Sequence, residues 1–215
     1  MLNRAHYPVT TLGPGVRAGF WVQGCTIGCH RCASQDTWPA DPSRLVDVGQ
    51  LIDWLATLPR LEGLTVTGGE PFQQPEAVHA LLAAVRDWAA EQGRVPDILV
   101  YSGYTYGALN RRASAAPVLA LCDAVITGPY VDRLNPGGRW RGSANQQLIV
   151  LSPLGHERFD NADADTSNAR EQRLQLSSDG RELWLIGIPG RGDLAELEHD
   201  LELRGVTMRG QSWPG

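Results

Sequence analysis

The sequence predicts an α/β protein built on about six strands. Short apolar runs, typical of buried strands, alternate with longer segments whose apolar residues repeat at helical spacing. Polar or glycine-rich residues close each apolar run, and this order favours right-handed parallel crossovers. At 215 residues the chain is long enough for one domain with a substantial core. This periodicity allows either an open doubly wound sheet or a partial barrel.

The expected elements follow one another along the first 151 residues. A helix is expected between Ser43, the candidate N-cap, and Pro59, and a longer amphipathic helix at about 75–92. Strands are expected at 9–12, 18–23, 63–67, 98–102, 124–127 and 147–151.

The character of the chain changes after residue 151. Residues 152–172 are polar and predict a mobile loop. Residues 173–215 predict an extension packed on the core, with a hairpin around Ser178-Asp179-Gly180, a helix at about 193–203 and a strand near 206–208. We therefore divide the chain into a core (1–151), a polar loop (152–172) and a C-terminal extension (173–215).

Composition excludes several classes of partner. The net charge of −5 gives no electrostatic reason to expect binding to nucleic acid or to an anionic membrane. No apolar stretch has the length of a bilayer span, and the amino terminus has no signal-peptide core. We expect a cytoplasmic protein, in which thiols stay reduced and a cysteine cluster indicates metal or redox chemistry.

Three of the four cysteines form a cluster with the spacing C-x3-C-x2-C. Cys25, Cys29 and Cys32 directly follow the strand expected at 18–23, so they lie where α/β folds place their chemistry. A structural zinc site needs a fourth ligand, for which His30 is poorly placed between two cysteines. An iron–sulfur cubane held by three cysteines keeps one iron open for a ligand. Both centres remain possible from the spacing.

A second motif, Gly68-Gly69-Glu70-Pro71, follows the next strand. Its glycines allow close backbone approach, and Glu70 can accept hydrogen bonds from an ammonium group. The motif is expected at the same end of the sheet as the cysteines. Taken alone, it is equally typical of a tight strand-to-helix turn.

Together the two motifs resemble the radical S-adenosylmethionine (SAM) superfamily. Over roughly residues 5–150 the chain is similar to the small activating enzymes of anaerobic ribonucleoside-triphosphate reductase, a class of glycyl-radical-enzyme activases. The further segments that carry this resemblance are His6-Tyr7-Pro8-Val9, Gly13-Pro14-Gly15-Val16-Arg17, Gln23-Gly24-Cys25, Asp36-Thr37-Trp38, Tyr101-Ser102-Gly103-Tyr104-Thr105 and Trp140-Arg141-Gly142-Ser143-Ala144-Asn145-Gln146.

The resemblance implies a partial (β/α) barrel of about six parallel strands, of the radical SAM type. It implies that Cys25, Cys29 and Cys32 ligate a [4Fe-4S] cluster with one open iron, which binds the amine and carboxylate of SAM. The SAM contacts that it implies are Gly68, Gly69 and Glu70 at the amine, Arg31 and Ala33 near the adenine, and Ser102 and Asn145. One electron, from a donor such as flavodoxin or ferredoxin, then cleaves SAM to methionine and a 5′-deoxyadenosyl radical.

Three functions follow as hypotheses. The first is activation of a glycyl radical enzyme by hydrogen abstraction from a glycine. The second is a stand-alone radical SAM enzyme that modifies a small molecule or peptide, with residues 152–215 shaping the substrate site. The third, a non-catalytic iron–sulfur or zinc module, does not explain the Gly-Gly-Glu motif.

The chain departs from its relatives in two places. Arg31 stands where many superfamily members have an aromatic residue, and about sixty residues follow the point where the reductase activators end. We interpret Trp38 and Trp184 as packing residues.

Overall fold

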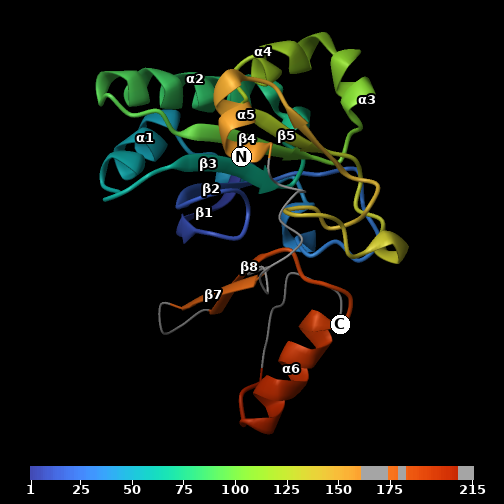
Figure 1. Cartoon of the computed structure of the whole chain (residues 1–215). Helices are drawn as coiled ribbons and strands as arrows, with labels where there is room; N and C mark the ends of the chain where they lie inside the picture. The colour runs from blue at the N-terminus through green and yellow to red at the C-terminus, as the bar shows by residue number, and fades with distance from the viewer. Residues whose placement is uncertain (161–173, 179–182, 208–215) are drawn as a thin grey trace.

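A computed structural model shows a six-stranded sheet with most of its helices on one face, while the helix Pro153–Phe159 packs on the other face; a separate β-hairpin and a last helix lie below the sheet (Figure 1). It describes residues 1–160, 174–178 and 183–207. The strands are β1 (Leu2–Val9), β2 (Arg17–Val22), β3 (Gly63–Gly68), β4 (Asp97–Ser102), β5 (Ala124–Thr127), β6 (Gln147–Val150), β7 (Leu174–Ser178) and β8 (Leu183–Gly187). The helices are α1 (Val48–Ala56), α2 (Pro75–Glu91), α3 (Tyr106–Asn110), α4 (Ala116–Leu119), α5 (Pro153–Phe159) and α6 (Asp193–Leu203).

Strand order in the large sheet follows chain order from β1 to β6, which is compatible with a partial barrel. Only β2, β3, β4 and β5 are parallel, whereas β1 and β6 run antiparallel to their neighbours. The prediction of about six parallel strands is therefore wrong at both edges. The reason is that residues 10–16 and 128–146 hold no α-helix, so the chain reverses at one end of the sheet instead of crossing over it.

The first strand and the first helix begin at other residues than the sequence predicts. The first strand is Leu2–Val9, not 9–12. Helix α1 begins at Val48, because the Asp47 side chain caps it by accepting from the Gly49 N–H at 2.7 Å. Ser43 is not its N-cap and lies instead in a 3-10 turn capped by Asp41.

The C-terminal prediction is confirmed for the hairpin β7–β8 and for α6. The loop expected over 152–172 is wrong at its start, because α5 occupies Pro153–Phe159 and its last residue is buried against the Trp140 ring, with ring centroids 5.6 Å apart. The rest of that loop, residues 161–173, lies outside the described residues. Of the strand expected near 206–208, Val206 and Thr207 are not in a strand, and Met208 is not described.

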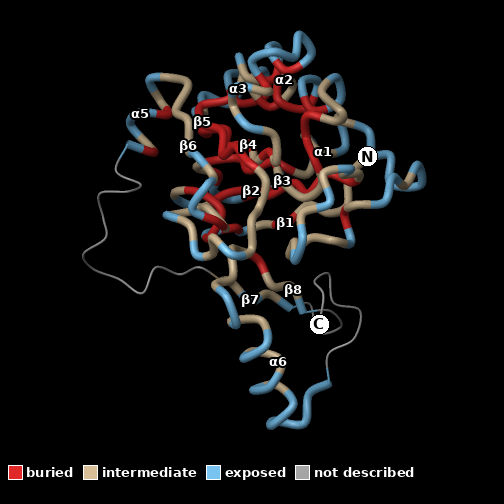
Figure 2. Tube along the Cα trace, turned by 90° about the vertical axis from the view of Figure 1, so that its right-hand side faces the viewer, coloured by how far each residue is buried: buried red, intermediate tan, exposed pale blue. Residues whose placement is uncertain are grey.

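The main core lies between the sheet and α1, α2 and α4. Along β2, Ala18, Phe20 and Val22 belong to this core, and the alternate residue Trp21 packs on the other face. Buried residues are concentrated in this part of the molecule, whereas α6 has none (Figure 2). No helix in the described part of the chain is long and apolar enough to cross a membrane.

A buried ion pair joins the amino-terminal ends of the parallel strands. The Arg17 guanidinium donates to both Asp97 carboxylate oxygens, at 2.6 and 3.1 Å, and to Thr65 Oγ1 at 2.7 Å; both side chains of the pair are fully buried. Gly13 and Gly63 make room for it, because an added Cβ would lie 2.7 and 2.1 Å from guanidinium atoms. The Gly-Pro-Gly-Val-Arg segment is thus a structural motif in this chain.

We expect Arg17→Met to lower the free energy of unfolding by about 3–5 kcal/mol, because Asp97 is left charged and unpaired in the interior. The measurement is chemical denaturation followed by circular dichroism. The double variant Arg17→Met/Asp97→Leu should recover much of the loss. A loss below about 1 kcal/mol in the single variant, the range of exposed pairs, would contradict the assignment.

Candidate functional site

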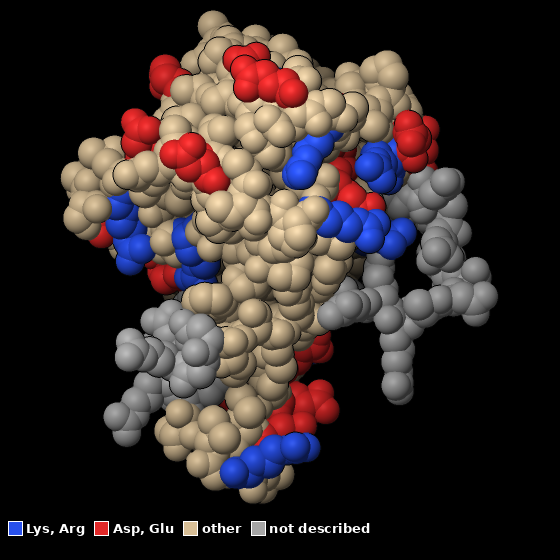
Figure 3. Space-filling view, turned by 90° about the vertical axis from the view of Figure 1, so that its left-hand side faces the viewer, with Lys and Arg blue, Asp and Glu red and all other residues tan. Residues whose placement is uncertain are grey.

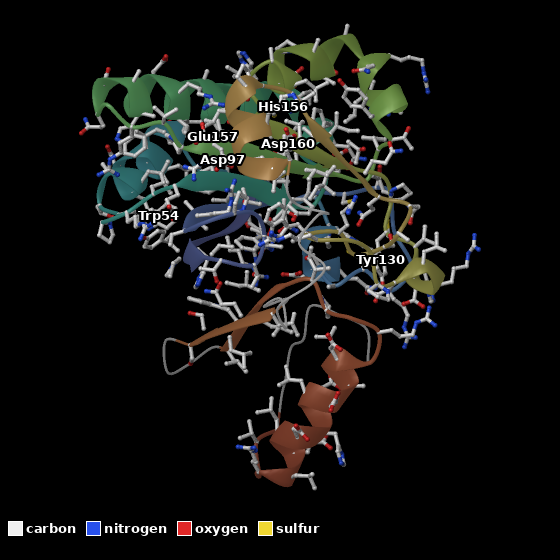
Figure 4. The ribbon with its side chains drawn as sticks, viewed as in Figure 1. Trp54, Asp97, Tyr130, His156, Glu157 and Asp160 are labelled. Carbon is white, nitrogen blue, oxygen red and sulfur yellow. The ribbon has the colours of Figure 1, made fainter. Side chains whose placement is uncertain are left out.

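The predicted site lies at the carboxyl ends of the parallel strands. The cysteine loop follows β2, the Gly-Gly-Glu segment follows β3, and Ser102 ends β4. Tyr130, on the loop after β5, lies at the other end of the sheet from Asp97 (Figure 4). The parallel register of the four strands brings these segments to one edge.

The cysteine loop is fixed at its start by backbone hydrogen bonds from both sides. The Gly24 and Cys25 N–H groups donate to the carbonyls of Thr37 and Trp38, at 2.7 and 3.0 Å. The Gly24 carbonyl accepts from the Glu70 N–H at 2.9 Å. The two predicted motifs are therefore joined directly through their backbones.

Gln73 adds a side-chain clamp on the same loop. Its Oε1 accepts from the Thr26 N–H at 3.0 Å, and its Nε2 donates to Thr26 Oγ1 at 2.7 Å and to the Tyr104 hydroxyl at 3.0 Å. Gln73 lies in the 3-10 turn Pro71–Gln73 that follows Glu70. The clamp holds the stretch between Cys25 and Cys29 against the next two strands.

The glycines of the second motif allow the backbone at the end of β3 to pack closely against the backbone of β2 and of the cysteine loop. A Cβ on Gly69 would lie 2.3 Å from the Gly24 carbonyl oxygen. A Cβ on Gly68, which has φ +93°, would lie 2.7 Å from Trp21 Cα. Gly103 likewise leaves room for the Ile27 side chain, because a Cβ added at Gly103 would lie 2.6 Å from Ile27 Cδ1. These glycines let the cysteine loop lie against β3 and β4.

Glu70 is 1% exposed, and three donors hold its carboxylate. Oε1 accepts from the Phe72 N–H at 3.0 Å and from Ser102 Oγ at 2.9 Å, and Oε2 accepts from the Gly103 N–H at 2.7 Å. Burial raises the pKa of Glu70, and these hydrogen bonds oppose the rise. Because Oε2 has one partner among these, it keeps acceptor capacity for a further donor.

N–H groups lie around two of the three cysteine sulfurs. Cys32 Sγ accepts a hydrogen bond from the Ser34 N–H at 3.4 Å, and the Trp38 side chain lies near this sulfur. The Tyr130 backbone N–H lies near Cys29 Sγ. Burial raises the pKa of both thiols in the free protein. Such N–H donors are suited to a sulfur that carries negative charge, as a metal-bound thiolate does.

The donor set fits an iron–sulfur cluster better than a single ion. In the described part of the chain, no three His, Cys, Asp or Glu side chains converge as ligands of one metal ion. A zinc site requires all its ligands within about 2.0–2.3 Å of one ion, whereas cysteines around a cubane each bind a different iron. Cys122 is buried and its Sγ contacts the Val118 carbonyl oxygen at 3.2 Å, so it supplies no fourth ligand.

A chamber of about 1200 Å³ opens in front of these residues. Asn145 lies outside its lining: it is exposed, and its side-chain amide donates to the Pro129 carbonyl at 2.8 Å. Arg31 has φ +59°, an uncommon conformation for a residue other than glycine. The predicted site residues that line the chamber are Cys25, Cys29, Arg31, Cys32, Ala33, Gly68, Gly69, Glu70 and Ser102.

The far wall of the chamber is formed by the C-terminal segment, which we define as residues 174–178 and 183–207. On one side, Gln175 Nε2 donates to the Pro8 carbonyl at 2.6 Å, and the Trp184 ring meets the His6 ring edge-on at 4.9 Å between centroids. On the other side, Arg191 Nη2 donates to the Asp132 carbonyl at 2.8 Å. The segment thus spans the mouth of the sheet from β1 to the loop after β5.

The surface of the C-terminal segment is largely acidic along α6. Figure 3 shows acidic atoms on this lobe, with basic atoms at its lower tip. Helix α6 carries Asp193, Glu196, Glu198, Asp200 and Glu202. Any partner that docks against this lobe from outside meets negative charge.

Sequence reasoning missed three residues that act around the cysteine loop: Gln73, Trp38 and Tyr130. Gln73 and Trp38 lie within or beside the predicted motifs. The sequence therefore shows where they stand in the chain, but it does not show which atoms their side chains contact. Tyr130 acts through its backbone, and for such a contact no side-chain signal exists.

Comparison with known proteins supports the cluster assignment. Residues 11–149 match the family model of the 4Fe-4S single cluster domain. The chain belongs to this family. The matched region starts before β2 and ends within β6, so it contains every predicted site residue. The protein is an iron–sulfur enzyme of the radical SAM, activase-like class, as the two motifs predict.

Curated relatives agree with the family match. The chain is 31% identical to the anaerobic ribonucleoside-triphosphate reductase-activating protein of Vibrio cholerae over 149 residues, which are 66% of this chain and 94% of that protein. The protein of the same name from Pasteurella multocida is 32% identical over 149 residues, 92% of its length. The pyruvate formate-lyase-activating enzyme of Staphylococcus aureus is 36% identical over 84 residues, 36% of this chain and 34% of that enzyme.

Proposed function

We propose that this enzyme reductively cleaves SAM and uses the resulting radical to activate a glycyl radical enzyme. Cys25, Cys29 and Cys32 would hold the [4Fe-4S] cluster. The cluster, once bound and reduced by a donor such as flavodoxin or ferredoxin, supplies one electron that breaks a carbon–sulfur bond of SAM to give methionine and the 5′-deoxyadenosyl radical. The observation that carries the proposal is the shared chamber of the three cysteines and the Gly-Gly-Glu segment.

The chain's own residues bind and orient the ligand in this proposal. The free acceptor capacity of Glu70, fixed by Ser102 and Gly103, would receive the ammonium group of SAM. Ser102 would act through Glu70, because its hydroxyl donates to that carboxylate. Arg31 and Ala33 line the chamber beside Cys32 and would contact the adenine.

The chamber must also exclude water and oxygen while the radical exists. The C-terminal segment covers the mouth of the sheet through contacts on both sides, which supports this role. The radical would then abstract a hydrogen atom from the target glycine. The names of the relatives, which activate ribonucleotide reductase and pyruvate formate-lyase, support a target of this kind.

Anaerobic reconstitution tests the proposal. We expect the iron-loaded protein, reduced with dithionite in the presence of SAM, to form 5′-deoxyadenosine and methionine in equal amounts, measured by liquid chromatography and mass spectrometry. Omission of the reductant is the control and should give neither product. Full iron loading without 5′-deoxyadenosine would contradict the proposal.

A second function is supported by one observation. The matches to the reductase activators cover nearly all of those proteins over 149 residues, and the C-terminal segment follows the matched family region yet lines the chamber. A wall specific to this chain would suit a stand-alone enzyme that modifies a small molecule or a peptide. The two functions can be distinguished by where the radical ends up. Only an activase produces a glycyl radical on an added partner protein, and electron paramagnetic resonance (EPR) detects that radical.

A further inference from the structure

Two buried polar atoms in the wall of the chamber have no hydrogen-bond partner among the described residues. They are His6 Nε2 and Asn135 Oδ1. His6 is 7% exposed, and Asn135 is half-buried. Buried polar atoms in proteins nearly always have a partner, so each exception calls for an explanation. Because both residues line the chamber, a molecule that binds there can supply the missing partners.

The orientation of the Asn135 amide is fixed by the hydrogen bonds that its nitrogen donates. Nδ2 donates to the Pro189 carbonyl at 3.1 Å and to the Tyr130 hydroxyl at 3.2 Å. A carbonyl oxygen only accepts, so the amide nitrogen has to face Pro189 and the amide oxygen points elsewhere. The bond to Pro189 also places Asn135 against the C-terminal segment. Asn135 Oδ1 is therefore a hydrogen-bond acceptor beside the far wall of the chamber.

His6 contacts the same C-terminal segment from the side of β1. The Trp184 ring meets its imidazole edge-on, with ring centroids 4.9 Å apart. Burial, and to a smaller extent the charge of Arg4, lower the pKa of His6, so the imidazole is uncharged at neutral pH. A nitrogen of an uncharged imidazole accepts or donates one hydrogen bond, depending on the tautomer.

His6 is set back from the end of the sheet at which the cysteine loop begins. It pairs with Gly19 in the β1–β2 register, whereas Val22 is the last residue of β2. The three residues between these positions span about 10 Å along a strand. Apolar side chains of one cluster line the chamber on this wall: Leu12, Trp21, Ile186 and Ile188. Such surroundings favour an uncharged ligand, because a charged group would lose its hydration there.

We propose that His6 and Asn135 are the polar contacts of a second binding site in the chamber, which takes an uncharged amide carried on an apolar body. An amide offers both a donor and an acceptor, so it suits an imidazole of either tautomer and the acceptor Asn135 Oδ1. Because His6 Nε2 is buried, the ligand reaches it by displacing the neighbouring Trp184 ring. The inference rests on the proposed function in that this ligand is the target of the radical.

The test measures the dissociation constants of two matched pairs of amide probes by ligand-detected NMR. The protein is the full chain with cluster and SAM but without reductant, so that no radical forms. One pair is the capped tripeptide acetyl-leucyl-glycyl-leucine amide and its fully N-methylated analogue, and the other is benzamide and N,N-dimethylbenzamide. In at least one pair we expect wild type to bind the N–H form about fivefold more tightly, the usual effect of one hydrogen bond between uncharged groups.

The variant that tests the protein side is His6→Phe, which keeps a ring beside Trp184 and removes both ring nitrogens. We expect it to bind the N–H probe about fivefold more weakly than wild type does. His79→Phe is the matched control, because His79 is exposed on α2 and does not line the chamber. We expect this control to keep the affinity of wild type. The comparison of the two probes in wild type does not depend on the folding of either variant.

The two probe pairs also distinguish the source of the amide. A preference for the N–H form of the tripeptide indicates a peptide, and a preference in the benzamide pair alone indicates a small molecule; both outcomes support the site. Equal binding of the two forms in both pairs would overturn the inference, as would equal affinities of wild type and His6→Phe. Failure of the proposed function is distinguishable, because absence of 5′-deoxyadenosine in the reduction assay contradicts SAM cleavage whether or not the probes bind.

Discussion

Replacing Cys25, Cys29 or Cys32 by alanine is expected to abolish cluster assembly and SAM cleavage. Loss of a supporting residue around a metal ligand typically costs 10–100-fold in affinity or activity, so loss of a ligand itself should lower 5′-deoxyadenosine formation by more than about 100-fold. Iron content, the visible absorption of the reconstituted protein and product formation measure the effect.

Cys122→Ala is the matched control, because Cys122 is a free thiol in the main core and away from the loop. We expect it to keep its cluster and its activity, with a modest loss of stability from the small cavity. Equal loss of cluster in all four variants would contradict the assignment of ligands, since it would indicate general misfolding.

The second large effect is expected from Gly69→Ala. The added methyl group would lie 2.3 Å from the Gly24 carbonyl oxygen, and this neighbour is backbone that cannot rotate away. Either the cysteine loop or the end of β3 must move, which breaks the hydrogen bond between the Glu70 N–H and Gly24. We expect a loss of about 1–3 kcal/mol in stability and of most cluster binding, measured by denaturation and iron analysis.

Gly107→Ala serves as its control. Gly107 lies in α3, and an added Cβ would have ordinary contact with Arg111 Nη1 at 3.6 Å. We expect stability to stay the same or to rise slightly, because alanine favours a helix over glycine. If Gly69→Ala binds its cluster as well as Gly107→Ala does, the close approach of the two motifs has no role in cluster assembly.

The sequence was most informative where chemistry and backbone constraints coincide. Periodicity was enough to predict β2, β3, β4 and β5, because these strands are buried and closed by glycine or polar residues. The cysteine spacing and the Gly-Gly-Glu turn located the two sides of the site. Even so, the role first given to Gly69 was approach to a ligand, whereas the structure shows it packed against Gly24.

The features that the sequence did not predict depend on contacts between residues that lie far apart in the sequence. The antiparallel edges depend on how segments 10–16 and 128–146 turn, and local apolarity does not report strand direction. Helix α5 begins in a polar stretch, and its stability comes from the Ser152 cap and from Phe159 packing under the sheet. Asn145 lies in a family-like segment, and its amide donates to the Pro129 carbonyl, a partner that the sequence does not indicate.

The central claim is that the three cysteines leave an open iron to which SAM binds beside Glu70. The most direct measurement is pulsed EPR of the reduced cluster with SAM labelled by ¹⁵N at the amine and ¹⁷O at the carboxylate. The account predicts a changed EPR spectrum on SAM addition and couplings from both labels. An unchanged spectrum without either coupling, in protein with a full cluster, would contradict it.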